Sequence, residues 1–174
     1  MGCVATERLD AAHRLLRKAA SDLAAARTLA RDPDQADEPI GFHGHQTVEK
    51  SVKAVLRCLD VDFHPTHDID SLLREVAQQD MPIPDLVLSA RWIDDWDMTI
   101  CYEEAKTILD RMQAIDLATA ALAWAQEVVS TTADEPAQAA YSDTLPLPAG
   151  WDRMLDGRPM PDIVAEIRRA RDSR

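Results

Sequence analysis

The sequence predicts an all-α protein, an antiparallel up-and-down bundle of four to five helices with a flexible linker and a short C-terminal helix. Apolar residues recur every three or four positions over long stretches, and no stretch alternates apolar and polar residues over the length of a strand. The chain is rich in alanine and has only 5 glycines, a composition that favours helices. Short connections that contain proline separate the periodic stretches, which is typical of helical bundles.

The first two helices are long. We expect one over residues 6–31, with Thr6 as its N-cap, because leucine and alanine recur there along one seam. The segment "RDPDQADEP" ends this helix, and a second helix is expected over about 41–60. Its apolar face consists of Val48, Val52, Val55 and Leu59.

A third, short helix is expected over about 68–79. Pro65 ends the preceding segment, and the residues that can cap the new helix are Thr66, Asp68 and Asp70. A fourth helix begins near Asp85 and carries Leu86, Ala90 and Ile93. The acidic segment "DDWDM" at 94–98 then predicts a solvated, irregular turn.

The last helix of the bundle is expected over about 102–130. Its predicted seam consists of Ile108, Met112, Ile115, Leu122 and Val129. Periodicity stops after this helix, so we divide the chain into a bundle at 1–130, a linker at 131–147 and a C-terminal docking segment at 148–174. The docking segment contains a short helix at about 162–172, which is too short to be stable alone and should dock on the bundle or on a partner.

Charge and cysteine content restrict the class of protein. The net charge is −12, which argues against a general DNA-binding protein because phosphate neutralisation drives that affinity. The 3 cysteines are widely spaced, which argues against a disulfide framework and suits a reducing cytoplasm. No apolar run approaches the ~20 residues that a membrane span requires, so we expect no membrane association.

The second helix carries many polar side chains. On a helical wheel one set lies opposite the valine face: His43, Gln46, Thr47, Lys50, Ala54 and Arg57. A second set lies between the two faces: His45, Glu49 and Lys53. Glu49 precedes Lys53 by four residues, the favourable order for an ion pair. The pattern fits two interpretations, the solvated side of an amphipathic helix or a functional site.

The order of these residues resembles the HEPN domain family, a nucleotide-binding domain of higher eukaryotes and prokaryotes. That family shows Phe-His-x-x-Gln-x-x-Glu-Lys-x-x-Lys-Ala and then Thr-His-Asp-[Leu/Ile]. The matching residues are Phe42, His43, Gln46, Glu49, Lys50, Lys53 and Ala54, then Thr66, His67, Asp68 and Ile69. Two flanking pieces also resemble the family: "SDLAAARTL" through Asp22, Leu23 and Ala26, and "SARWIDDW" through Ala90, Arg91, Trp92 and Trp96. The resemblance covers residues 6–130 and fits the prokaryotic stand-alone type.

The resemblance implies a bundle that is usually a homodimer and works near nucleotides or RNA. Many members are encoded beside a minimal nucleotidyltransferase in toxin–antitoxin pairs, and others are metal-independent ribonucleases. We therefore expect a bacterial, cytoplasmic homodimer that binds a nucleotide, RNA or a nucleotidyltransferase partner. The expected ligand-binding residues are His43, Gln46, Glu49, Lys50, Lys53, Arg57 and His67.

The ribonuclease members resemble one another in an Arg-x4-6-His motif. Metal-free RNA cleavage needs a base for the 2′-hydroxyl proton and a cation for the phosphate, and a histidine with a nearby arginine provides both. Arg91 is followed by four residues and then by Trp96 instead of histidine. Arg57 and His64 match the spacing, although they lie at the end of the second helix and in the following connection, and arginine is frequent in this chain. Arg57, His64 and Arg91 are the candidate catalytic residues of an alternative hypothesis, a ribonuclease toxin.

Histidines also raise the question of a metal. His43 and His45 are about 200° apart on the helix and cannot share an ion, whereas His64 and His67 flank a proline turn and could. We expect neither a metal nor a cofactor, and we expect His67 to orient the connection by a hydrogen bond. A third hypothesis is a purely structural interaction module. The cationic stripe favours a binding protein over that module, and the missing histidine after Arg91 disfavours the ribonuclease.

Overall fold

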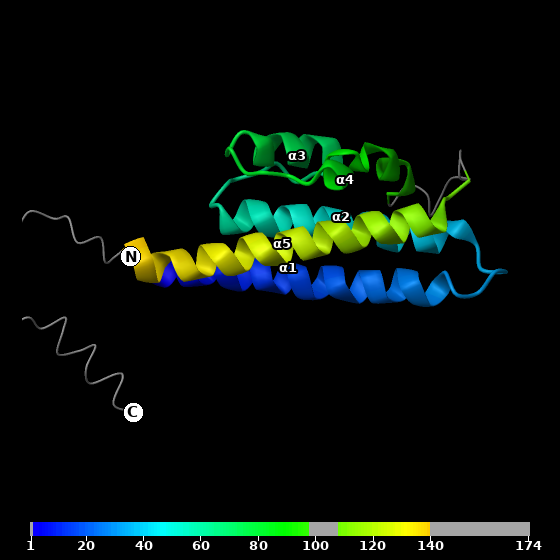
Figure 1. The fold of residues 1–174 in the computed structure, drawn as a ribbon, viewed down its shortest axis with the longest axis horizontal. Helices are drawn as coiled ribbons and strands as arrows, with labels where there is room; N and C mark the ends of the chain where they lie inside the picture. The colour runs from blue at the N-terminus through cyan, green and yellow to red at the C-terminus, as the bar shows by residue number, and fades with distance from the viewer. Residues whose placement is uncertain (1, 98–107, 140–174) are drawn as a thin grey trace, which may run out of the picture. The chain divides into compact units, whose positions relative to one another are not determined.

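The computed structural model describes residues 2–97 and 108–139, and every regular element within these ranges is helical (Figure 1). The helices are α1 (Gly2–Leu29), α2 (Asp37–Cys58), α3 (Ile69–Ala77), α4 (Asp85–Leu88), the 3₁₀ helix η1 (Ala90–Trp96) and α5 (Arg111–Ala139). The predicted all-α fold is confirmed. The chain divides into two compact units, Met1–Pro136 and Ala137–Arg174, and the site lies wholly in the first.

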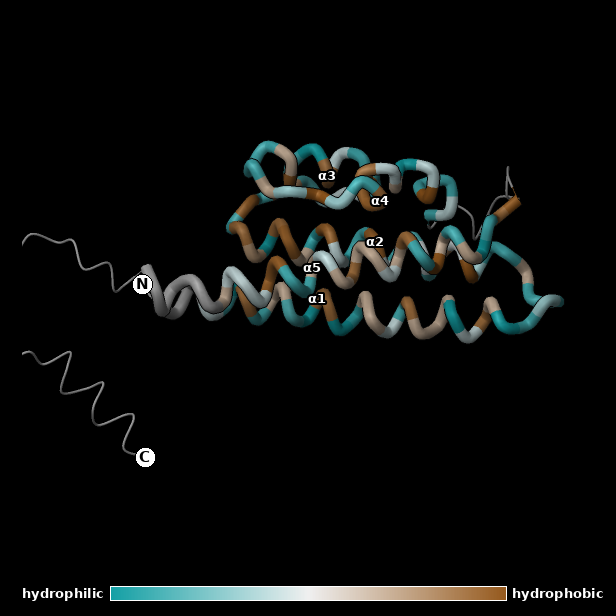
Figure 2. Tube along the Cα trace, viewed as in Figure 1, coloured by the Kyte–Doolittle hydropathy of each residue, from teal (hydrophilic) through white to brown (hydrophobic). Residues whose placement is uncertain are grey.

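Helix α2 is the central element of the first unit. It packs along α1 on one side, and α3 and η1 pack against it on another (Figure 1). Helix α5 contributes Ala114, which lies beside Gly44 of α2. Hydrophobic residues recur along the whole of α2 (Figure 2). This central position explains why α2 buries residues on nearly all sides.

Helix α2 begins one turn earlier than the predicted start at 41. Pro39 lies in its first turn, where the backbone N–H groups have no partner within the helix, so a proline costs no hydrogen bond there. Asp37 and Glu38 precede it, and their negative charges interact favourably with the positive N-terminal end of the helix dipole. Residues 31–36 form the predicted break, and Asp37, Glu38 and Pro39 belong to the start of α2.

The middle of the chain follows the prediction in part. Asp68 caps α3 by accepting the backbone N–H of Ser71 at 3.1 Å, which confirms one of the proposed caps. The expected fourth helix is divided into α4 and η1, and Leu86 is exposed instead of packed. The predicted irregular turn at 94–98 is wrong for 94–96, which end η1.

The predicted start of the last helix is wrong, and its predicted seam is right for Leu122 and Val129 but wrong for Ile108 and Met112. Residues 108–110 are not helical, and the side chains of Ile108 and Met112 are 94% and 69% exposed. The buried seam of α5 consists of Ala114, Leu117, Ala118, Ala121, Leu122, Trp124, Ala125, Val128 and Val129. The prediction followed large apolar residues alone, whereas the buried seam also contains four alanines, which allow α5 to approach its neighbours closely.

Arg111, at the first position of α5, holds the connection between α1 and α2. Its Nε donates to Asp37 Oδ1 at 2.7 Å, and its Nη1 donates to the carbonyl oxygen of Asp32 at 3.0 Å. Its Nη2 donates to the carbonyl oxygen of Gln35. One guanidinium therefore ties the start of the last helix to the acidic connection before α2.

The end of α5 bears on the predicted boundary between bundle and linker. Helix α5 continues to Ala139, so the first residues of the predicted linker are helical. The rest of that linker and the docking segment at 148–174 lie outside the described residues. The division into bundle, linker and docking segment stays a prediction.

Candidate functional site

The solvent-facing side of α2 is polar. Between Ile40 and Cys58 the residues that are not buried are Phe42, His43, Gln46, Lys50, Lys53 and Arg57. Apart from Phe42, they are spaced alternately by three and four residues, which keeps them on one side of the helix. We call His43, Gln46, Lys50, Lys53 and Arg57 the α2 strip; it extends about 21 Å along the helix axis, at 1.5 Å per residue.

On the α1 side of the strip, Asp22 holds two of its members. Lys50 Nζ donates to Asp22 Oδ2 at 2.5 Å, and His43 Nδ1 lies 3.0 Å from Asp22 Oδ1. Asp22 comes from α1, so these contacts also fasten α1 to α2. The signature residue Asp22 of the upstream piece therefore contacts the signature residues of the main helix.

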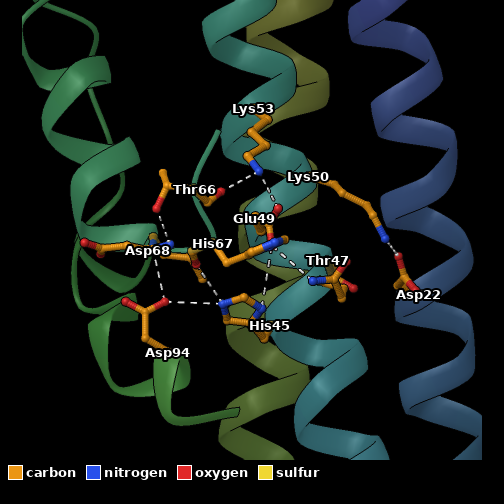
Figure 3. A network of polar contacts seen from close by, with 12 residues as sticks. Asp22, His45, Thr47, Glu49, Lys50, Lys53, Thr66, His67, Asp68 and Asp94 are labelled. Atoms are coloured by element: carbon orange, nitrogen blue, oxygen red, sulfur yellow. Dashed lines mark hydrogen bonds and ion pairs between the residues drawn. The ribbon is translucent and has the colours of Figure 1, made fainter. Parts of the chain in front are cut away.

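On the other side of the strip, Glu49 is the acceptor (Figure 3). Its Oε1 accepts from Lys53 Nζ at 2.5 Å, which confirms the ion pair predicted from the spacing. Its Oε2 accepts from Gln46 Nε2 at 3.0 Å and lies 3.0 Å from His67 Nδ1. Glu49 itself is buried, so it acts beneath the strip and not on the surface.

His45, Glu49 and Lys53 together fix the connection that carries His67. They are spaced by four residues, so they line one side of α2. His45 Nε2 lies 3.1 Å from the carbonyl oxygen of His67, and Lys53 Nζ donates to the carbonyl oxygen of Thr66 at 2.7 Å. His67 is held by its backbone through His45 and by its ring through Glu49, which confirms that a hydrogen bond of His67 orients this connection.

Asp94 of η1 completes the network. Its Oδ1 lies 3.3 Å from His45 Nε2 and accepts the backbone N–H of Ile69 at 3.1 Å (Figure 3). Because both neighbours of His45 Nε2 are acceptors, this nitrogen carries the proton. His45 Nδ1 is buried without a hydrogen-bond partner and lies 3.8 Å from Glu49 Oε2.

The charge of Glu49 is stabilised by this arrangement. Burial alone would raise the pKa of Glu49, but the hydrogen bonds from Lys53 and His67 and the positive charge of Lys53 outweigh it. The pKa of Glu49 is therefore held below its ordinary value, and the buried carboxylate is ionised at neutral pH.

The solvated side of α2 is narrower than the helical wheel predicted. Thr47 and Ala54, which the helical wheel placed opposite the valines, are fully buried, as is His45. Thr47 Oγ1 donates to the carbonyl oxygen of His43 at 2.8 Å. The wheel assumed one buried face, whereas α1, α3, η1 and α5 surround α2 and leave only the narrow α2 strip.

The candidate catalytic residues are not brought together as a ribonuclease pair. Arg57 lies over the ring of Phe63, 4.8 Å from its centroid, and 3.8 Å from Asp62 Oδ1. His64 is exposed and its Nδ1 lies 3.1 Å from the carbonyl oxygen of Pro65. Arg91 is exposed at the surface of η1.

Trp96 occupies the position where the ribonuclease pattern would have histidine. Its side chain is 2% exposed and packs on α2. A side chain at this position points into the core, so it cannot reach the 2′-hydroxyl of an RNA from there.

In the described part of the chain, no group of three or more His, Cys, Asp and Glu side chains has the arrangement of a metal site. None of the helices in that part of the chain is long and apolar enough to cross a membrane.

The comparison with protein families gives a match over most of the bundle. Residues 12–135 match the model of the HEPN domain. The chain belongs to the HEPN domain family, as its motifs predicted. The search of curated proteins found no match, and neither did the search of solved structures.

Sequence reasoning missed two contributors to the site. Asp22 was noted only as a residue that matches the family motif. It is an acidic residue in an alanine-rich stretch, and such a residue could have suggested an ion pair with another helix. Asp94 was interpreted as part of a solvated turn, and no local pattern distinguishes it from Asp95. Only the fold places Asp94 beside His45.

Proposed function

We propose that this protein binds a nucleotide or RNA through the α2 strip and His67, and that it does not cleave RNA. The observation that carries the proposal is the composition of the strip. The only side chains that α2 turns to solvent beyond its first turn are Phe42 and five polar residues, of which three are cations and one is histidine. A chain with a net charge of −12 thus places three cations along one solvent-facing strip, each of them beside one carboxylate.

The chemistry of the strip suits phosphate. Lysine and arginine neutralise phosphate oxygens, and the contribution is electrostatic and independent of base sequence. Arg57 adds a second capacity, because a guanidinium held over an aromatic ring offers its other face for stacking on a base. Its position at the end of the strip extends the surface beyond α2 towards Phe63.

The proposed absence of cleavage rests on the two candidate catalytic pairs, Arg57 with His64 and Arg91 with position 96. Trp96 is buried at the position that should supply the base, and Arg57 and His64 each have other partners.

The homodimer, the cytoplasmic location and the nucleotidyltransferase partner in a toxin–antitoxin pair belong to the same proposal. They follow from membership of the family, in which such arrangements are common. A dimer would place two α2 strips in one assembly and would increase the affinity for a ligand that contacts both.

The proposal is tested by binding. A labelled mononucleotide and a labelled single-stranded RNA are titrated with the purified chain at several salt concentrations, and fluorescence anisotropy reports binding. For single-stranded RNA, the slope of log K against log salt is about −0.7 for each phosphate contacted. We expect Arg57→Ala to weaken binding and to reduce the size of this slope by about 0.7.

The matched control is Arg17→Ala. Arg17 is exposed on α1, about 140° around that helix from Asp22, so it points away from the strip. We expect it to leave the slope unchanged. Equal effects of Arg17→Ala and Arg57→Ala, or no binding of either probe, would contradict the proposed function.

A further inference from the structure

Two similar groups of side chains each include members of the α2 strip. In each, a carboxylate holds a lysine on one oxygen and the Nδ1 atom of a histidine on the other. The first group is Lys50–Asp22–His43, with separations of 2.5 and 3.0 Å. The second is Lys53–Glu49–His67, also with separations of 2.5 and 3.0 Å. We call these the two carboxylate–histidine groups.

The carboxylates fix which ring nitrogen is available. An ionised carboxylate only accepts hydrogen bonds, so the Nδ1 atom beside it must carry a proton. The remaining nitrogen of each ring, Nε2, is then free to meet a ligand. The side chains of His43 and His67 are 29% and 56% exposed, so both rings reach solvent, and the side chains of Asp22 and Glu49 are less exposed, at 15% and 5%.

We propose that Asp22 and Glu49 are positioning residues that turn the Nε2 atoms of His43 and His67 towards the phosphate groups of the ligand. This inference rests on the proposed function and names the atoms that perform it. A protonated imidazole donates from Nε2 to a phosphate oxygen, whereas the neutral ring with its proton on Nδ1 does not. Binding that requires the charged ring therefore weakens as the pH rises.

Charged and aromatic side chains surround the rings of His43 and His67. His43 faces Asp22 from α1 and Lys50 from α2, with the ring of Phe42 at 5.4 Å between centroids. His67 faces Glu49, which also binds Lys53.

The backbone of His67 contacts the buried His45, which is also beside Asp94 from η1, and its chain neighbour Asp68 is exposed. Histidine is the side chain whose unperturbed charge change lies between about pH 5 and pH 8.

His64 provides a matched control. It lies three residues before His67 on the same connection and is exposed as well, but its Nδ1 atom meets the carbonyl oxygen of Pro65 instead of a carboxylate. A general effect of histidine charge on binding would involve His64 as much as His67. The proposed positioning involves only His67 and His43.

The first test measures binding against pH. The probe is a labelled single-stranded RNA of about ten nucleotides, within the usual range of single-strand site sizes. Its internal phosphodiesters do not titrate near neutral pH. We expect affinity for the wild-type chain to fall by about tenfold between about pH 6 and pH 8, the size of one lost charge-assisted hydrogen bond.

The variants separate the histidines. His67→Gln and His43→Gln should each reduce this pH dependence, and His64→Gln should retain it. Binding that does not change with pH, or a loss of pH dependence in His64→Gln equal to that in His67→Gln, would overturn the inference while the proposed function stands. Absence of binding at both pH values would overturn the proposed function itself.

The second test does not depend on a ligand or on a folded variant. Nitrogen-15 NMR of the wild-type chain distinguishes the two neutral tautomers of each histidine. We expect the proton on Nδ1 in His43 and His67, and on Nε2 in His45. A proton on Nε2 of neutral His43 and His67 would overturn the inference, because those rings would not be held by Asp22 and Glu49.

Discussion

The indole ring of Trp96 lies directly on the backbone of Gly41. A Cβ atom at Gly41 would come within 2.4 Å of Trp96 Cε3 and 2.5 Å of Cδ2. Helix α2 thus needs glycine where η1 packs its tryptophan, and the "ARWIDDW" segment is fastened to the signature helix by this contact. The same contact removes position 96 from the surface and separates this chain from the ribonuclease pattern.

Gly41→Ala should destabilise the protein by about 1–3 kcal/mol, because the new methyl group overlaps a ring that is fixed in the core. Urea unfolding followed by circular dichroism measures this change. Gly44→Ala is the control: its Cβ would meet the end of the Ile93 side chain at 3.2 Å, and alanine favours helix. We expect a change of less than about 1 kcal/mol there. Equal stability of the two variants would contradict the close packing of Trp96 on Gly41.

Trp96→His restores the Arg-x4-His spacing with Arg91 but should not produce a ribonuclease. The new imidazole would lie in the core, and loss of the indole should cost about 3–5 kcal/mol. RNA incubated with the folded fraction in EDTA should stay intact. Cleavage by this variant would mean that position 96 reaches the substrate.

Glu49→Gln should change how stability depends on pH. The folded-state pKa of Glu49 lies below its ordinary value of 4.5, so its charge stabilises the fold at higher pH. That contribution is lost as the pH falls below about 4.5 towards the folded-state value, since the unfolded chain then binds the extra proton.

Urea unfolding of both proteins at neutral pH and at about pH 4 provides the measurement. We expect Glu49→Gln to be less stable by about 1–3 kcal/mol at neutral pH and the difference to shrink in acid. The pKa of Asp68 is also lowered, by its hydrogen bonds with Ser71, but Asp68 is present in both proteins and cancels in the comparison. A difference that grows in acid would be inconsistent with a stabilised Glu49 carboxylate.

Arg111→Lys should be less stable by about 1–2 kcal/mol although the charge is kept. A lysine is a point charge and cannot reproduce the three directed hydrogen bonds to Asp37, Asp32 and Gln35. Arg27→Lys is the control, because Arg27 donates only one hydrogen bond, to Thr119 Oγ1, at an exposed position. We expect a change within about 0.5 kcal/mol for the control. Thermal melts of the two variants should therefore differ.

Local patterns predicted the parts of the fold that depend on local chemistry. The all-α fold, the Asp68 cap and the Glu49–Lys53 pair follow from periodicity, turn chemistry and helix spacing. The family motifs also led to α2, the helix on which the proposed site lies. These features involve residues that are near in sequence, so local interactions determine their energies.

The failures concern contacts between distant segments. The helical wheel assumed that α2 has one buried face, and only the packing of its neighbours buries Thr47 and Ala54. The buried face of α5 includes four alanines, and the small size of an alanine does not indicate whether it is buried. Asp22 and Asp94 join the network from other helices, so no spacing within α2 could indicate them.

The central claim is that the α2 strip binds a nucleotide or RNA while the chain leaves RNA uncut. The most direct measurement incubates the labelled single-stranded RNA with the wild-type chain in EDTA, at a concentration at which anisotropy shows it bound, and then analyses its length. We predict bound, full-length RNA. Cleavage that persists in EDTA and disappears in Arg57→Ala, His64→Ala or Arg91→Ala would contradict the claim and would identify a metal-independent ribonuclease.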